Sequence, residues 1–148
     1  MGIVATTLGS WRHGARAISL GMTLSALLFA SGAAAGQKEN VDALYRLIIQ
    51  KVDSTIGTSG ELKGQPTDYT GKKLPKALVV CIKWSDVAPT RYAGRFSVRT
   101  GSSSNPPRSV DAAVAEATNA CKGHCKAACV VADRNGQNAL QPPADWYP

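Results

Sequence analysis

Acidic residues, histidines and catalytic motifs are all scarce in this chain. Its 148 residues include 10 Asp and Glu against 17 Lys and Arg, and only 2 His, of which His124 alone lies beyond the N-terminal segment. No serine stands in a nucleophile-elbow sequence, and no pair of cysteines has the Cys-x-x-Cys spacing of redox sites. The acidic residues are scattered rather than paired. We therefore expect a protein that is not an enzyme and has no cofactor.

The N-terminal segment lacks acidic residues and lacks an apolar run as long as a typical membrane span. Two arginines precede an apolar stretch at 18–30, and the small-residue tract SGAAAG follows it. This order is typical of a secretory signal peptide, here residues 1–35, with small residues at Ala33 and Ala35. A cut after Gly36 and an uncleaved membrane anchor are the alternatives, although a spanning helix needs about 20 mostly apolar residues. We expect a periplasmic or secreted protein.

Basic residues still exceed acidic ones after residue 35, by 15 to 10. Such an excess favours anionic surfaces, although net charge carries no specificity. No helix-turn-helix, zinc-finger or base-stacking pattern accompanies it, so nucleic acid is not an expected partner. The candidates are an acidic glycan, an anionic lipid surface, or a protein.

The first mature segment, residues 36–56, predicts an amphipathic helix. Asn40 is a suitable N-cap, and apolar residues recur at helical spacing up to Thr55. Those that form the stripe are Val41, Leu44, Leu47, Ile48 and Val52. The stripe could pack on the domain core, or it could bind a partner or a second copy.

Residues 57–75 contain four glycines and two prolines and predict a flexible linker. A linker this long is uncommon inside a compact domain, so we expect the helix to be semi-independent.

Residues 76–141 predict a small, disulfide-stabilised β-β-α-β(-β) domain of the α+β class. A continuous apolar run indicates a central strand, an alternating run indicates a half-buried one, and a serine cap and a glycine stop bound an alanine-rich helix. In chain order these elements are Ala77–Ser85, Arg91–Thr100, the helix from Ser109 to Gly123, Lys126–Ala132 and, after the Asn135-Gly136 turn, a short strand at 137–141.

The crossover rule fixes the expected strand order. A right-handed connection through the helix makes the third strand parallel to the second, with the first strand between them. Residues 142–148 form a C-terminal tail, whose Trp146 and Tyr147 either fold back on the domain or form a contact patch.

Arginines repeat at every fourth residue of the second strand. Arg91, Arg95 and Arg99 share one face of the expected strand, opposite Phe96 and Val98. Such a row is either a solvated face that protects an edge strand or an anion-binding ridge. These three residues are the candidate binding site.

All four cysteines lie beyond the expected cleavage site, which predicts two disulfides in an oxidising compartment. They are Cys81, Cys121, Cys125 and Cys129. Three connectivities are open. One joins Cys121 to Cys125 and Cys81 to Cys129; a rival joins Cys81 to Cys121 and Cys125 to Cys129. The alternative function is a periplasmic metal-binding or thiol redox protein, whose ligands would be Cys121, His124, Cys125 and Cys129.

Several of these segments carry a resemblance to known proteins. They are KALVVC, the helix SVDAAVAEATNAC, Cys125, and CVVADRNGQNAL. Together they resemble a group of small exported domains of unknown function that are common in alphaproteobacteria. The resemblance implies an extracytoplasmic β-β-α-β domain, and it implies no particular reaction or ligand.

Overall fold

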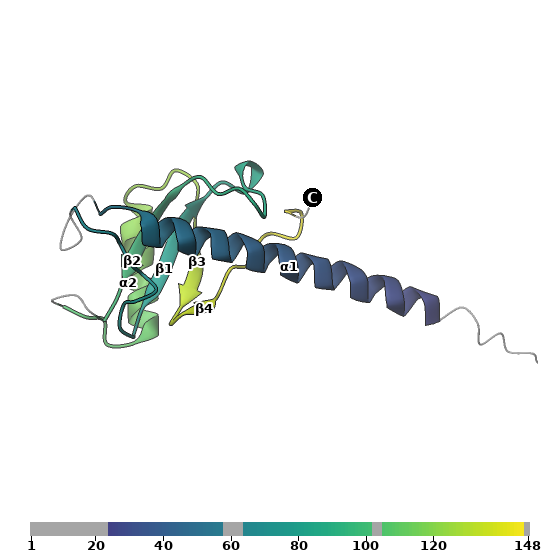
Figure 1. Cartoon of the computed structure of the whole chain (residues 1–148), viewed down its shortest axis with the longest axis horizontal. Coiled ribbons are helices and arrows are strands. Elements are labelled where there is room, and N and C mark those ends of the chain that lie inside the picture. Colours follow the sequence, from purple (N-terminus) through teal and green to yellow (C-terminus); the bar gives the residue numbers. More distant parts are fainter. Residues whose placement is uncertain (1–23, 58–63, 102–104, 147–148) are drawn as a thin grey trace, which may run out of the picture.

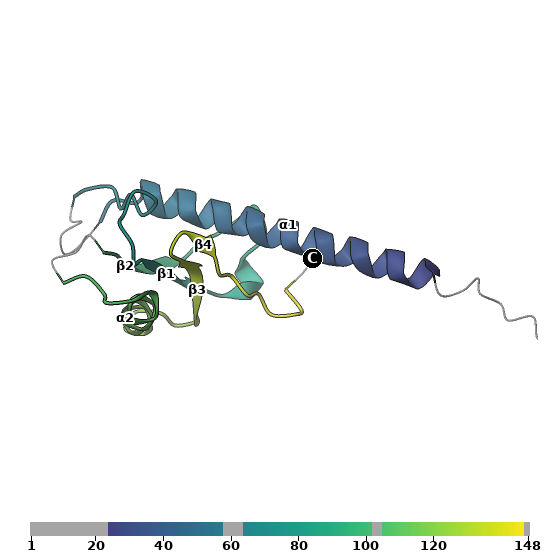
Figure 2. The ribbon, with the colours of Figure 1, turned by 90° about the horizontal axis from the view of Figure 1, so that it is seen from below.

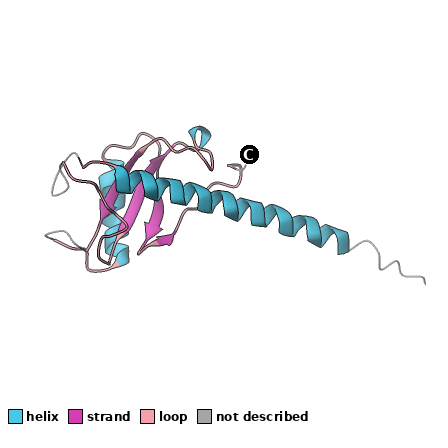
Figure 3. Ribbon diagram, viewed as in Figure 1, coloured by secondary structure: helices cyan, strands magenta, loops and turns pink. Residues whose placement is uncertain are grey.

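The described part of the chain forms two α-helices and one four-stranded sheet, which confirms the α+β class (Figures 1 and 3). The computed structural model describes residues 24–57, 64–101 and 105–146, so most of the expected signal peptide lies outside the described residues. The elements are α1 (Leu24–Ser54), β1 (Ala77–Ile82), the short 3-10 helix η2 (Trp84–Asp86), β2 (Arg95–Arg99), α2 (Val110–Lys122), β3 (Ala128–Arg134) and β4 (Gln137–Asn138).

The strand order of the sheet is β2-β1-β3-β4. Because β1 pairs antiparallel with both β2 and β3, these two flanking strands run in the same direction. The predicted order, with the first strand between the second and third, is therefore correct. Ala77 to Val80 of β1 are fully buried, as expected of a central strand covered on both faces.

Two helices cover opposite faces of the sheet, so the domain has three layers (Figure 2). On the α1 side, Leu78, Val80 and Ile82 of β1 join the main hydrophobic cluster with residues of α1. On the α2 side, Val79 packs with Ala117 and Cys121 in a second, smaller cluster. The alternating side-chain directions of β1 thus divide its residues between two cores.

Helix α1 is longer and more firmly attached than expected. It begins at Leu24 rather than Val41, so Asn40 lies inside the helix and is not its N-cap. Its apolar stripe is buried, since Leu44, Ile48 and Val52 are fully inaccessible and belong to the main core. The prediction of a semi-independent helix is therefore wrong. This stripe packs on the domain core and is not open to a partner.

The segment that was expected to be a flexible linker folds back on the end of α1. Its residues 58–63 lie outside the described residues, but Gly57 N–H donates to the Gln65 carbonyl at 2.9 Å, and the Thr67 hydroxyl donates to the Thr55 carbonyl at 2.9 Å. The side chains of Thr67 and Tyr69 are buried. The composition rich in glycine and proline therefore marks a structured turn region here, at least over residues 64–75.

The remaining elements follow their local signals closely. Helix α2 begins after Ser109, whose Oγ accepts a hydrogen bond from the Ala112 N–H at 3.1 Å, and it ends before Gly123. Strand β2 starts at Arg95 instead of Arg91, and β4 contains only two residues of the five expected. Asn135 and Gly136 both have positive φ, as a tight hairpin turn between β3 and β4 requires.

The C-terminal tail folds back on the domain as far as it is described. The Trp146 ring is buried, its indole N–H donates to the Val87 carbonyl at 3.1 Å, and it meets the Trp84 ring edge-on with centroids 5.4 Å apart. Tyr147 lies outside the described residues.

Candidate functional site

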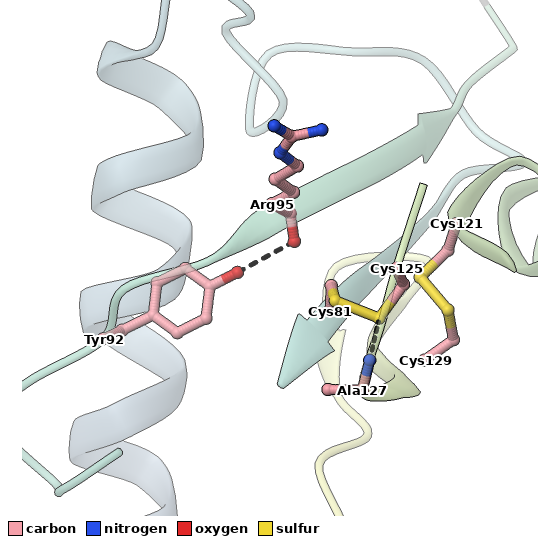
Figure 4. The surroundings of a disulfide bond; sticks show 7 residues. All are labelled: Cys81, Tyr92, Arg95, Cys121, Cys125, Ala127 and Cys129. Carbon is pink, nitrogen blue, oxygen red and sulfur yellow. Dashed lines mark hydrogen bonds between the residues drawn. A yellow bond between two sulfur atoms is a disulfide. The ribbon is translucent and has the colours of Figure 1, made fainter. Parts of the chain in front are cut away.

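The four cysteines form two neighbouring disulfides on the α2 side of the sheet (Figure 4). Cys81 is bonded to Cys125, and Cys121 is bonded to Cys129. This is the third connectivity, and both pairings that the sequence positions favoured are wrong. Cys81 and Cys129 lie directly opposite each other on paired strands. The Cβ atoms of such a pair are typically about 4.5–5.5 Å apart, whereas the mean Cβ–Cβ distance in a disulfide is about 3.8 Å. Cys81 is bonded instead to Cys125, in the chain just after α2, and Cys129 is bonded to Cys121, in the last turn of α2.

The disulfides leave no thiol for a metal. The Sγ atoms of Cys121, Cys125 and Cys129 lie within 4.8 Å of one another, but all three are oxidised, and His124 is not part of this group. The four ligands of the alternative hypothesis are therefore not assembled in the described structure. Two disulfides in so small a chain indicate a non-cytoplasmic environment.

The three arginines of the expected ridge do not share one strand. Arg91 precedes β2, in a turn whose backbone bonds join it to Ala88. Arg95 and Arg99 lie at the two ends of β2, and Arg99 forms an ion pair with Glu116 of α2 at 3.3 Å. Tyr92 is buried beneath this strand, and its hydroxyl donates to the Arg95 carbonyl at 3.0 Å (Figure 4). Two residues of the expected row thus lie on β2, and one of them, Arg99, is ion-paired; Arg91 is exposed but lies outside the strand.

A second group of polar residues, which the sequence did not single out, lies on the α1 side of the sheet. Its centre is Asp133, a fully buried carboxylate near the end of β3. The pairing of β1 with β3 shifts there, because Val79 faces Val131 whereas Leu78 faces Asp133. This bulge skips one residue of β3 and brings Asp133 to the face that carries Leu78. Strict alternation from Val131 would have directed Asp133 toward α2.

Two tyrosines and one backbone amide bind the Asp133 carboxylate. The Tyr45 hydroxyl, from α1, donates to Oδ2 at 2.5 Å, and the Tyr69 hydroxyl donates to Oδ1. The Gly136 N–H in the β3–β4 turn donates to Oδ1 at 2.8 Å. Burial, followed by the hydrogen bonds to Asp133, raises the pKa of both phenols above its ordinary value. Both tyrosines therefore remain neutral donors at physiological pH.

A buried lysine lies on the other side of Tyr69. The side chain of Lys76 is almost inaccessible, and its ammonium donates to the carbonyls of Tyr69 at 3.1 Å and Thr70 at 2.9 Å. The same ammonium stands over the Tyr69 ring, 4.8 Å from its centroid. Among the described residues, no carboxylate lies within ion-pair distance of Lys76. A buried cation and a buried anion are thus connected through a single tyrosine.

These residues line an open groove between α1 and the β3–β4 turn. Its volume is about 650 Å³, within the usual range of ligand pockets. Helix α1 supplies one wall with Tyr45, Arg46, Ile49 and Gln50; Lys76 and Asp133 line the groove from the sheet. In the last turn of α1, Asp53 accepts hydrogen bonds from the Thr70 N–H at 3.0 Å and the Thr70 hydroxyl at 2.5 Å. These bonds fix segment 67–76 against the helix.

Sequence patterns gave little reason to select this group. Tyr69 lies in a stretch with the composition of a linker, and Asp133 is one of ten scattered acidic residues. The one local signal is the Asn135-Gly136 turn after an apolar strand, which fixes the hairpin but not the face on which Asp133 lies. An alternating pattern of apolar and polar residues does not reveal a strand bulge, so the sequence does not predict that Asp133 joins this site.

The comparisons with known proteins add no identification. No family model matches the chain, and no match was found among curated proteins or solved structures, so the resemblance to exported alphaproteobacterial domains stays a prediction. Within residues 24–57, 64–101 and 105–146, no helix is long and apolar enough to cross a membrane.

Proposed function

We propose that the protein is an exported, non-enzymatic binding domain that takes a small ligand in the groove between α1 and the β3–β4 turn. The observation that carries this proposal is the buried network of Asp133, Tyr69 and Lys76 at the wall of an open 650 Å³ groove. The two disulfides support a compartment outside the cytoplasm. Release into the periplasm or the medium after cleavage near Ala35 belongs to the same proposal.

The charged groups at the groove wall are buried at an energetic cost. A buried ionised group costs several kcal/mol of desolvation, and well-packed apolar residues often serve stability equally well. A domain of this size gains little from such a network for stability alone. Buried ionisable groups that line a cleft are therefore candidates for a functional site, because a role in recognition explains their energetic cost better than a role in stability.

The chemistry of the groove favours binding over catalysis. The two phenols are held neutral and donate hydrogen bonds to Asp133. No histidine or cysteine is among the described residues that line the groove, so it offers none of the usual proton carriers near pH 7. An apolar wall with a few polar side chains, such as those of Arg46 and Gln50, is what a ligand pocket needs to set orientation and fit.

The arginine side of β2 remains a second proposed surface. Arg95 is exposed, and among the described residues its side chain has no ion-pair partner. It faces solvent beside the ion-paired Arg99, on a strand at the edge of the sheet. An acidic glycan or an anionic lipid surface is the partner this charge would favour.

A fragment screen by NMR tests the groove. The uniformly ¹⁵N-labelled oxidised protein is titrated with a library of small aromatic and aliphatic compounds, and amide shifts are mapped. We expect the hits to shift the amides around Tyr45, Thr70 and Gly136. Gln50→Trp, which places a large ring in the groove mouth, should abolish these shifts, whereas Lys51→Trp on the neighbouring exposed position should not. Hits that map elsewhere, or that survive Gln50→Trp, contradict the proposal.

A further inference from the structure

We infer that the groove selects an amphipathic anion, a small molecule with a carboxylate or phosphate group attached to a flat apolar body. The inference rests on the proposed function and names its ligand class. It assigns Arg46 as the residue that binds the anionic group.

The charges that line the groove are almost all engaged by the protein itself. Asp53 is bound by Thr70, and Asp133 accepts three hydrogen bonds. Lys76 is held by two carbonyls and the Tyr69 ring. A ligand therefore meets neither a vacant carboxylate nor an accessible ammonium. Among the described lining residues, Asp53 is the one carboxylate that is not fully buried, and each of its oxygens already accepts a hydrogen bond from Thr70.

Arg46 is the exception among these charged residues. Its side chain is exposed at the groove wall, and no hydrogen bond or ion pair joins it to another described residue. A guanidinium offers five donors in a planar fork, which matches a carboxylate or a phosphate by two parallel hydrogen bonds. The excess of 15 basic over 10 acidic residues after residue 35 favours an anion at longer range as well.

The apolar part of the ligand follows from the neighbours of Arg46. Tyr45 and Ile49 belong to the same wall of the groove, and both are only partly buried. Because the Tyr45 hydroxyl is turned to Asp133, its ring rather than its polar tip is left for contact with a ligand, whereas the Tyr69 ring is fully buried. A flat ring system can stack on these surfaces while its anionic substituent reaches Arg46.

The test uses four probes that share one ring system and differ in charge. They are 2-naphthoate, 2-naphthyl phosphate, neutral 2-naphthamide and cationic 2-naphthylmethylammonium, each titrated into the full oxidised protein at constant ionic strength. We expect one or both anions to bind at least about tenfold more tightly than the amide, and the cation to bind most weakly. The two anions show whether a carboxylate or a phosphate is preferred.

Variants then separate a specific contact from general attraction. Arg46→Gln should weaken anion binding about tenfold or more and leave the amide unchanged, and Arg46→Lys should recover part of the loss. Arg108→Gln removes an equal charge at an exposed position outside the groove and should have little effect. The inference is overturned if Arg46→Gln leaves anion binding intact, or if Arg108→Gln weakens it equally. Binding of the amide in the groove with no anion preference would refute the ligand class alone; absence of binding by all four probes would count against the proposed function too.

Discussion

At the scale of single residues, the hydroxyl of Tyr69 is the most consequential polar group in the domain. It donates a hydrogen bond to the fully buried carboxylate of Asp133, whereas the Tyr92 hydroxyl donates to the neutral backbone carbonyl of Arg95. Tyr69→Phe should therefore lower the free energy of unfolding by about 2–3 kcal/mol, and Tyr92→Phe by about 1 kcal/mol. Urea denaturation of both variants at neutral pH measures the difference. Equal losses would mean that Asp133 does not depend on Tyr69.

The same tyrosines make the domain sensitive to alkali. Burial raises the pKa of Tyr92 to about 12, while an exposed tyrosine in the unfolded chain titrates near pH 10. Above pH 10 the native state thus holds a proton that the unfolded state releases, so stability falls as pH rises, and the loss is complete near the native pKa. The slope is up to about 1.4 kcal/mol per pH unit for each such tyrosine.

Denaturation in urea at intervals from pH 8 to pH 11 checks this dependence. Tyr92→Phe should decline less steeply than the wild type above pH 10, because it has one fewer tyrosine that titrates differently in the two states. All other ionisable groups are the same in the two proteins, so the difference between their slopes reports on Tyr92. A variant with an unchanged slope would contradict the assignment to Tyr92.

At the scale of elements, the two disulfides should differ in their contribution to stability. The Cys81–Cys125 bridge spans 44 residues and joins β1 to the chain after α2, whereas Cys121–Cys129 spans only 8. The chain-entropy model gives about 4 kcal/mol for the longer loop and about 2.5 kcal/mol for the shorter one. Urea denaturation of Cys81→Ala/Cys125→Ala and of Cys121→Ala/Cys129→Ala tests the order, and peptide mapping of the oxidised wild type verifies the pairs. A larger loss for the second variant would reverse our ranking.

The elements that are predicted correctly are those whose capping residues and apolar runs lie within the element itself. Ser109 caps α2, the apolar run at 77–82 is the central strand, and the connection through α2 sets the strand order. The start of α1 was missed because leucines and alanines upstream of Asn40 favour a helix, which overrides a capping residue. The cysteine pairing and the face of Asp133 were missed because both depend on how strands and helix meet, which no local pattern records.

At the scale of the whole molecule, α1 connects the expected signal segment to the core. The helix is continuous from Leu24 to Ser54, and within its residues 35–54, whose burial is described, the first fully buried residue is Leu44. We expect the exported protein to begin at Gly36 and to contain two disulfides, so that its intact mass gains four hydrogens on reduction. Mass spectrometry of the oxidised and reduced forms measures both properties. The mass of the uncleaved chain would instead support a retained N-terminal anchor.

The disulfide pattern also affects the order in which the domain can be completed. The bridges interlock in the sequence, since Cys121 lies inside the loop closed by Cys81 and Cys125, and its partner Cys129 lies outside it. A chain that enters an oxidising compartment N-terminus first presents Cys81 and Cys121 before either native partner has arrived. Oxidation that outpaces translocation would join these two and trap a misfolded intermediate. Correct assembly therefore requires the helix end and β3 to arrive before the thiols react, or a disulfide isomerase to exchange the first bond that forms.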